Sequence, residues 1–326
     1  APVLCTRASV LPWHTRRWVT GAEISSVSEL SSVGSRSAID RLRGPLERIV
    51  STYLGRSWQV AEARDLSDYA CHPCAILAAD AYSVFAKFTD ATDGQAQFEV
   101  ELAGLQDLTR LSGVATPTPL GVFEIEGGWV LVFETVVEVP RAAPQWRDIG
   151  RALAQIHRVK DSRFGLARHG TFGPLFQDNT PHDDWPTFFG ERRLRPGLRR
   201  AVDAGALSET LTRRIESILR RLPDLCGPPV APTLIHGDAQ KNNFISTAGG
   251  AVVIDPSIYF GHPEVDLAYV DYFEPVPDDL FDGYREALPI DPGFSGRRDL
   301  WRLWGYLSAV AVEVGGWYLE RLEAAA

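Results

Sequence analysis

Three features are scarce in this 326-residue sequence, and each scarcity excludes a class of protein. The four cysteines are too few for a disulfide-stapled scaffold of this length, so reduced thiols are expected. No apolar stretch approaches the roughly 18 residues that a membrane-spanning helix needs. No run of Lys and Arg occurs, and the net charge of −9 is opposite to that of a typical nucleic-acid-binding protein. We therefore expect a soluble, cytoplasmic protein with a small-molecule partner and with neither nucleic acid nor membrane as a ligand.

The composition is that of a globular protein with one large or two moderate domains, because 45% of the residues are hydrophobic and 23% are charged. Residues 1–40 are rich in Ser, Arg and Val and show little periodicity, which predicts an extension outside the core. From residue 38 to residue 54 apolar side chains recur at helical spacing, and Gly55 follows as a stop. The chain is thus expected to begin with a tail and a first helix.

A small lobe is predicted over residues 41–138. Its short apolar runs, several of them separated by Asp-Ala or Gly-Gly turns, indicate an antiparallel sheet. One helix is expected within this set, over residues 95–111, with Phe98, Leu102 and Leu105 on one face. The expected strands are 58–61, 75–79, 82–88, 119–125 and 129–136.

A larger, mostly helical lobe is predicted over residues 139–326, beyond a boundary marked by Pro140 and Pro144. Residues 233–256 differ, because their pattern indicates a polar loop held by buried strands and a hairpin around Gly249-Gly250. The predicted fold class is therefore α+β, with two unequal lobes and a cleft between them. The expected helices are 145–159, 182–194, 208–222, 265–273, 278–287 and 297–322.

The strongest chemical signal is the sequence LIHGDAQKNN at 234–243, followed after the hairpin by VVIDP at 252–256. Phosphoryl transfer from a nucleotide needs a carboxylate that orients the acceptor hydroxyl and oxygen ligands for Mg²⁺. The hairpin can return Asp255 beside the first loop, so we expect Asn243 and Asp255 to hold the metal while Asp238 faces the acceptor. The alternative interpretation is that Asp238 and its neighbour His236 only form hydrogen bonds within a tight turn.

His-Gly-Asp, four residues, Asn and then Ile-Asp-Pro is a pattern that resembles the fructosamine kinase and aminoglycoside phosphotransferase superfamily. These are small-molecule kinases of protein-kinase-like fold. The similarity to fructosamine kinases continues through 259–268 and 284–298 and covers about 46–319. The resemblance implies two lobes, ATP and Mg²⁺ as cofactors, Asp238 as the catalytic base and Asp255 as a metal ligand.

The resemblance also implies a nucleotide site in the small lobe. Lys87 interrupts the apolar strand 84–88, where a lysine either reaches a bound phosphate or protects a sheet edge from aggregation. The family pairs this lysine with a helix glutamate, which corresponds to Glu101, with Glu99 as the competing candidate. The backbone from Glu134 to Val136 is then expected to bond the adenine.

Two segments depart from the family pattern. Residues 65–74 contain no glycine where the family has a glycine-rich loop over the phosphates, so phosphate contact by backbone amides is left open there. Residues 239–242 read Ala-Gln-Lys-Asn where fructosamine kinases usually have Leu-Trp-Ser-Gly. We therefore expect the acceptor to be a hydroxyl on a hydroxylated amine or sugar-containing molecule. One candidate is a sugar amine or ketosamine. The other is an aminoglycoside or other antibiotic, in a resistance or self-protection reaction.

The segment Cys71-His72-Pro73-Cys74 has the C-x-x-C spacing of redox and zinc sites. No second pair with this spacing exists, so two incidental thiols are one interpretation. The other is a redox latch, in which oxidation of Cys71 and Cys74 stiffens the phosphate loop. A pseudokinase or redox-responsive binding module is accordingly the non-enzyme alternative.

His262 and Glu264 follow the metal-ligand candidate in sequence and, with Trp185, are predicted to contact the substrate. The alternative for His262 is a structural hydrogen bond in its Gly-His-Pro turn. Asp266 is expected to cap a helix or to steady the catalytic loop. Further acids either attract an amine-bearing substrate or form a solvated face, and these are Asp183, Asp184, Asp271, Glu274, Asp278, Asp279 and Asp282.

Overall fold

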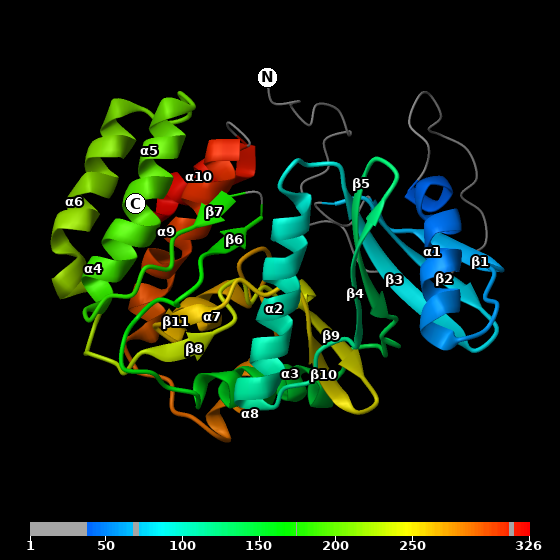
Figure 1. Cartoon of the computed structure of the whole chain (residues 1–326). Helices are drawn as coiled ribbons and strands as arrows, with labels where there is room; N and C mark the ends of the chain where they lie inside the picture. Colours follow the sequence, from blue (N-terminus) through cyan, green and yellow to red (C-terminus); the bar gives the residue numbers. More distant parts are fainter. Residues whose placement is uncertain (1–37, 68–71, 174, 313–315) are drawn as a thin grey trace.

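A five-stranded antiparallel sheet with one helix on each face forms the first part of the fold in a computed structural model of the chain, which describes residues 38–67, 72–173, 175–312 and 316–326 (Figure 1). The predicted extension, residues 1–40, lies outside the described residues except for its last three. The strand order is β1-β2-β3-β5-β4. The strands are β1 (Glu62–Asp65), β2 (Cys74–Ala79), β3 (Tyr82–Thr89), β4 (Pro119–Ile125) and β5 (Gly128–Glu134).

The two helices of the small lobe pack on opposite faces of this sheet. Side chains alternate between the faces of a strand, so Val84 and Ala86 of β3 pack toward α1 (Ala38–Leu54), whereas Phe85 packs with α2 (Gly94–Ser112). Lys87 follows the same alternation and shares the α2 face with Phe85. The alternation of side chains along β3 therefore places Lys87, the one lysine of this strand, on the face opposite the core under α1.

The first strand does not lie where the sequence pattern predicts it. Trp58 and Val60 alternate like strand residues and are 2% and 9% exposed, but they are not part of the sheet. Their backbone amides donate to side chains of α1, Trp58 to Ser51 (2.9 Å) and Val60 to Glu47 (3.0 Å). Pairing with β2 begins only at Ala61, whose amide donates to the Ala78 carbonyl (3.0 Å), because the hydrogen bonds to α1 replace strand pairing for 58–60.

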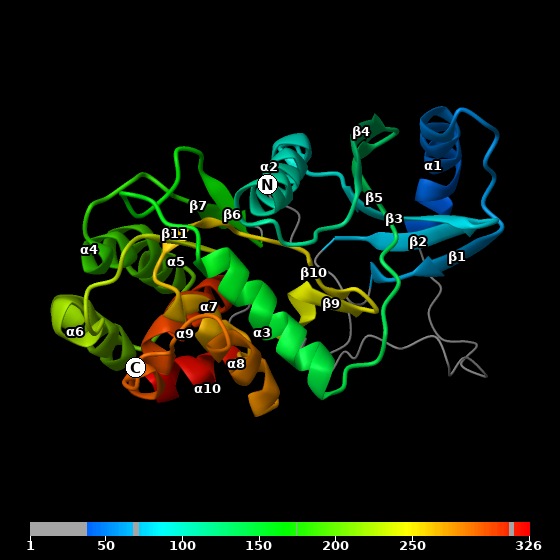
Figure 2. The same ribbon diagram turned by 90° about the horizontal axis from the view of Figure 1, so that it is seen from below.

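The large lobe is mostly helical and continues from the small lobe after β5 (Figures 1 and 2). Its helices are α3 (Ala143–His157), α4 (Trp185–Phe189) with a π-helical turn at Gly190–Leu194, α5 (Arg195–Asp203), α6 (Glu209–Leu225), α7 (Glu264–Tyr269), α8 (Asp278–Arg285), α9 (Phe294–Val312) and α10 (Gly316–Ala325). Three antiparallel strand pairs complete it: β6 (Gly170–Phe172) with β7 (Leu175–Gln177), β8 (Thr233–Ile235) with β11 (Tyr259–Gly261), and β9 (Phe244–Thr247) with β10 (Gly250–Val253).

Sequence patterns missed α5 and merged α9 with α10. Pro196 and Gly197 suggest a break after residue 194, but Pro196 occupies the first turn of α5, where a missing N–H costs nothing. Gly197 is a packing residue, since a Cβ there would lie 3.1 Å from the Leu307 side chain on α9. The predicted hairpin around Gly249-Gly250 is present as β9 and β10.

A cleft of about 1270 Å³ lies between the two lobes and is lined by residues of both. The small lobe contributes the α2 face of its sheet, and the large lobe contributes the loop after β8, the hairpin β9–β10 and one face of α9. Within the described residues, no helix combines the length and the apolar character that a membrane span requires.

Candidate active site

The buried carboxylate of Asp266 holds the loop that follows β8. The backbone amides of His236 and Gly237 donate to Asp266 Oδ2 (2.7 Å) and Oδ1 (2.9 Å). Asp266 is itself fully buried at the start of α7 and bonded to His157 Nε2 (3.0 Å), whose Nδ1 bonds Tyr284 Oη (2.9 Å). Asp266 thus steadies the loop that carries Asp238, in agreement with one of the two roles predicted for it.

Gly237 and His236 fix the path of this loop. Gly237 has φ +81°, and a Cβ at that position would lie 2.1 Å from the carbonyl oxygen of Ser257. The ring of His236 is fully buried, and this burial lowers its pKa, so the imidazole is neutral. Its Nδ1 accepts from the Asp238 amide (3.2 Å) and its Nε2 donates to the carbonyl of Ile254 (2.9 Å). His236 therefore ties the loop to the residue that precedes Asp255.

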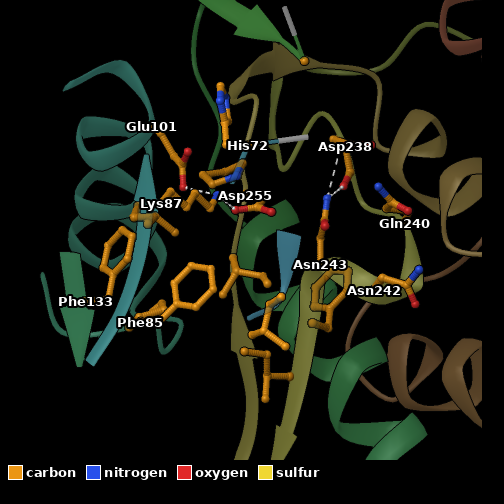
Figure 3. Close-up of a pocket in the computed structure, with 18 of the residues that line it drawn as sticks. His72, Phe85, Lys87, Glu101, Phe133, Asp238, Gln240, Asn242, Asn243 and Asp255 are labelled. Carbon is orange, nitrogen blue, oxygen red and sulfur yellow. Dashed lines mark hydrogen bonds and ion pairs between the residues drawn. The ribbon is translucent and has the colours of Figure 1, made fainter. Parts of the chain in front are cut away.

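The hairpin brings Asp238, Asn243 and Asp255 together, as the sequence predicts (Figure 3). Val253 of β10 pairs with Phe244 of β9, and the Ile254 amide donates to the Asn243 carbonyl (3.0 Å), so Asp255 emerges beside Asn243. The Asn243 side chain donates Nδ2 to Asp238 Oδ2 (3.1 Å) and to the Asp238 carbonyl (2.7 Å). These contacts fix the Asp238 carboxylate and leave the Asn243 Oδ1 without a hydrogen bond within the described residues.

On the other side of the cleft, Lys87 Nζ lies between two carboxylates (Figure 3). It forms ion pairs with Glu101 Oε1 (2.7 Å) and with Asp255 Oδ1. Lys87 is 7% exposed, so its ammonium is shielded from water, whereas the Asp255 side chain remains 42% exposed to the cleft. The competing candidate, Glu99, instead accepts from Gln95 Nε2 (2.8 Å) on the exposed face of α2.

Charge pairing sets the ionisation of Lys87, Asp255 and Glu101. Burial by itself would lower the pKa of Lys87, but the Asp255 and Glu101 carboxylates raise it above its ordinary value. Burial would raise the pKa of Asp255, and the Lys87 ammonium instead holds it below the ordinary value. Burial raises the pKa of Glu101 to about 7 in spite of Lys87. Asp255 is therefore the ionised carboxylate of the trio.

The pKa of Asp238 is shifted in the opposite direction from the pKa of Asp255. Its carboxyl lies deep in the cleft, and this burial, together with the nearby charge of Asp255, raises the pKa of Asp238 to about 7 against the Asn243 hydrogen bond, which lowers it. A carboxylate with a pKa near neutrality can take up and release a proton at physiological pH. Two aspartates in one site thus have separated ionisation ranges, which is typical of acid–base sites.

Asp238→Asn should stabilise the protein at alkaline pH. The folded-state pKa of Asp238 (about 7) lies above the ordinary 3.8, so its ionisation costs folding free energy as pH rises above 4, and the cost is complete above pH 7. Asparagine removes that cost, which we put at about 1–2 kcal/mol because water reaches the cleft. Thermal unfolding should show a gain at pH 8 that shrinks toward pH 4.5.

The matched control for this stability measurement is Asp224→Asn on the exposed side of α6. It makes the same change of side chain outside the cleft. A pH-independent effect of Asp238→Asn would contradict the raised pKa of Asp238.

The segment 134–136, whose backbone is predicted to bond the adenine and which we call the hinge, lines the cleft at the end of β5. The Glu134 amide donates to Thr118 O (2.8 Å) and the Thr135 amide to Ser83 O (3.0 Å). Val136 is the first residue beyond this pairing, and within the described residues no backbone hydrogen bond uses its amide. Its N–H is therefore available for a ligand in the cleft.

His72 is a cleft residue that the sequence analysis did not assign to the site. It lines the cleft beside Lys87 and Asp255, and its ring packs edge-on against Phe98 of α2 (5.4 Å) (Figure 3). Burial and the Lys87 ammonium lower its pKa. Its neighbour Cys71 lies outside the described residues, and with it the predicted redox latch, whereas Cys74 is a buried residue of β2.

The structure does not bring Trp185, His262 and Glu264, the predicted substrate contacts, to the cleft: all three are core residues at most 4% exposed, and none lines it. Glu264 accepts from Trp301 Nε1 (2.9 Å), and His262 stacks on the Trp301 ring (4.8 Å). The reason is strand direction. Since β11 runs antiparallel to β8, residues after Gly261 lie beyond the start of β8, at the opposite end from His236.

The acids proposed to attract an amine are mostly neutralised by basic partners. Asp271 pairs with Arg298 (2.8 Å) and Arg302 (2.5 Å), and Glu274 pairs with Lys241. Asp183, Asp279 and Asp282 are likewise ion-paired with arginines, and Asp184 caps α4. These carboxylates therefore do not form a free anionic surface beside the cleft.

Comparisons with known proteins agree with this arrangement. The family model for fructosamine kinase matches residues 45–325. The chain belongs to the fructosamine kinase family. It is 28% identical over 272 residues to a probable ketoamine kinase of Synechocystis, covering 82% of this chain and 90% of that protein. A putative fructosamine-3-kinase structure from Thermobifida fusca is 33% identical with a TM-score of 0.74, covering 86% of this chain and 98% of the other.

Membership of the fructosamine kinase family confirms the predicted enzyme class, an ATP-dependent small-molecule kinase with an alcohol group as acceptor. The α+β, protein-kinase-like fold is confirmed as well, since the chain is also similar to an aminoglycoside phosphotransferase structure (TM-score 0.58, covering 86% of this chain and 97% of the other). That similarity, at 14% identity, concerns the fold alone.

Proposed function

We propose that this fructosamine kinase family member transfers the γ-phosphoryl group of ATP to a hydroxyl of a ketosamine or related sugar amine, with Asp238 as the base. The observation that carries the proposal is the convergence of Asp238, Asn243 and Asp255 opposite the Lys87–Glu101 pair in one cleft. Phosphoryl transfer needs these parts together: a base, oxygen ligands for a metal and a fixed cation. The similarity to a probable ketoamine kinase and to a putative fructosamine-3-kinase supports the ketosamine as acceptor.

Asp238 is suited to the base because its pKa is about 7 and its geometry is fixed. The Asn243 side chain donates to one carboxylate oxygen of Asp238. Asp266 accepts from the backbone amides of His236 and Gly237, which precede Asp238. We assign the proton of the acceptor hydroxyl to the other oxygen. Positioning of this kind is most of what phosphoryl transfer asks of the protein.

Mg²⁺ fits the donor set of Asn243 and Asp255. Asp255 is ionised, and the Asn243 Oδ1 has no competing hydrogen bond within the described residues. Magnesium usually takes one or two protein oxygens and completes its coordination with phosphates and water, so a larger cluster of acids is not needed. When bound, the ion neutralises charge on the phosphates.

Nucleotide binding is assigned to the small lobe. Lys87, held by Glu101, supplies the cation for the phosphates, and the Val136 amide and Glu134 carbonyl at the hinge supply adenine contacts. His72 lines the same part of the cleft, where the family's glycine-rich loop is replaced. The completeness of this set supports a kinase over a pseudokinase.

The proposed function can be tested by incubating the protein with ATP and either a ketosamine panel or an aminoglycoside panel, with Mg²⁺ or with EDTA. We expect a mass gain of one phosphate on a ketosamine, only in the presence of Mg²⁺. Asp238→Asn serves as the matched inactive control. Phosphate on an aminoglycoside alone would contradict the proposed acceptor, and failure to bind ATP would contradict the small-lobe assignments.

A further inference from the structure

The cleft continues past Asp238 into a recess between α7 and α9. Gly305, Ser308, Ala309 and Val312 line it at positions i, i+3, i+4 and i+7 of α9, so one face of that helix, built from small side chains, forms one wall. Tyr269 at the end of α7 lies opposite. We call this part of the cleft, lined by Tyr269, Tyr272, Phe273, Ser308, Ala309 and Val312, the α9 recess.

Two hydroxyl groups in the α9 recess lack partners. Tyr269 is 1% exposed and Ser308 is 3% exposed, both line the cleft, and within the described residues neither hydroxyl has a hydrogen-bond partner. Buried hydroxyls are normally bonded, so each such group needs an explanation. Burial raises the pKa of Tyr269 well above its ordinary value, so its hydroxyl stays protonated and can donate.

Gly305 makes room for the tyrosines. A Cβ at this position would lie 2.7 Å from Tyr269 Oη and 3.0 Å from Tyr272 Oη. The two rings stack at 5.2 Å. Burial raises the pKa of both hydroxyls, and the charge of Asp238, which lines the same cleft, adds to that rise. The α9 recess therefore has one wall of aromatic side chains and one wall of small side chains, and both walls contribute hydroxyl groups.

Charge is the second property of the α9 recess. None of the six residues that define the α9 recess carries a charge, because burial raises the pKa of the two tyrosine hydroxyls and keeps them protonated. The Asp238 carboxylate lies at the inner end of the recess. The nearby acids Asp271 and Glu274 are neutralised by Arg302 and Lys241. At the outer end the apolar side chain of Val312 is 60% exposed. Such a site accommodates hydroxyls and apolar surface, and at most one positive charge.

We propose that the α9 recess is the acceptor subsite and that it selects small ketosamines whose nitrogen carries an apolar or aromatic substituent. The sugar hydroxyls bond Ser308 and Tyr269, and the substituent packs on Ala309 and Val312. Polycations and zwitterionic amino-acid substituents are disfavoured because the recess offers them no counter-charge. This inference rests on the proposed kinase function and specifies its substrate.

The experiment compares two ketosamines of the same sugar, one made from benzylamine and one from lysine, as substrates of the 326-residue chain. We expect kcat/KM to be at least tenfold higher for the benzylamine derivative. In Val312→Asp that ratio should fall by about fivefold or more, with KM for ATP unchanged. The matched control is Val202→Asp on α5, which is also exposed (43%) but outside the cleft, and it should leave the ratio as in the wild type.

A second pair of variants tests the hydroxyls. Tyr269→Phe and Ser308→Ala remove groups without internal partners, so the melting temperature should be unchanged or higher, while KM for the benzylamine derivative rises about five- to twentyfold. A purely structural hydroxyl would give the reverse, a lower melting temperature with an unchanged KM.

The outcomes separate the two levels of inference. Equal kcat/KM for the two ketosamines, or Val312→Asp behaving like Val202→Asp, would overturn the α9 recess as the selecting site while leaving the kinase function standing. Absence of phosphate on either compound would overturn the proposed function, and the recess assignment with it.

Discussion

Asp238→Ala should reduce kcat by about 10²–10⁴-fold, the range expected for loss of a general base. The affinity for ATP should stay within a few fold, because the groups assigned to ATP, Lys87 and the hinge at Val136, lie on other elements. An interaction made only in the transition state lowers kcat without changing ground-state binding. Turnover can be followed by product mass, and ATP affinity by calorimetry on the same preparation.

The isosteric variant Asp238→Asn keeps the size of the side chain and should be as inactive as Asp238→Ala. Asp224→Ala, on the exposed side of α6, is the matched carboxylate control and should retain full turnover. If Asp238→Ala keeps kcat within tenfold of the wild type, Asp238 is not the base and the alternative, a carboxylate that only shapes the turn, is correct.

Asp255→Ala should act on the metal-bound nucleotide instead. It removes the ionised carboxylate assigned to Mg²⁺ and leaves Asn243 as the remaining protein ligand. We expect the Kd for Mg²⁺-ATP to rise by about tenfold to a hundredfold and the Mg²⁺ concentration for half-maximal turnover to rise in parallel, with kcat reduced by about a thousandfold. Calorimetric titration of ATP at several Mg²⁺ concentrations measures the first effect directly.

The control for this variant concerns the backbone. Asp255 has φ +52°, a left-handed conformation that Asn tolerates better than Ala, so Asp255→Asn preserves the local geometry while removing the charge. Both variants should show the same direction of change, and the melting temperature of Asp255→Asn verifies that the fold is kept. An unchanged Mg²⁺ requirement in Asp255→Asn would show that another group holds the metal.

Together these two substitutions separate a base from a metal ligand. Asp238→Ala is expected to leave nucleotide binding intact and lose chemistry, whereas Asp255→Ala is expected to lose both. The distinction follows from electrostatics in the cleft: Lys87 keeps Asp255 ionised, while burial away from Lys87 raises the pKa of Asp238 to about 7.

Local chemistry determined much of this protein. The apolar periodicities predicted α1, α2 and most of β2 to β5, because a strand or helix that buries one face must repeat its apolar residues at period two or 3.6. The order His-Gly-Asp, Asn and Ile-Asp predicted a shared site, because a tight hairpin between Asn243 and Asp255 can only return the chain to the same place. These features depend on residues near one another in the chain.

Tertiary structure decided the rest. His262 and Glu264 lie in the core because β11 runs antiparallel to β8, and strand direction leaves no local trace. Trp185 of α4 packs against His262 there, a contact between segments far apart in the chain. Asp266 supports a loop 30 residues away, and the α9 recess joins α7 to a helix that begins near residue 294. Trp58 and Val60 show strand alternation yet bond α1. Contacts between distant segments depend on how elements pack, and a sequence pattern reports only which face of an element is buried, not what covers it.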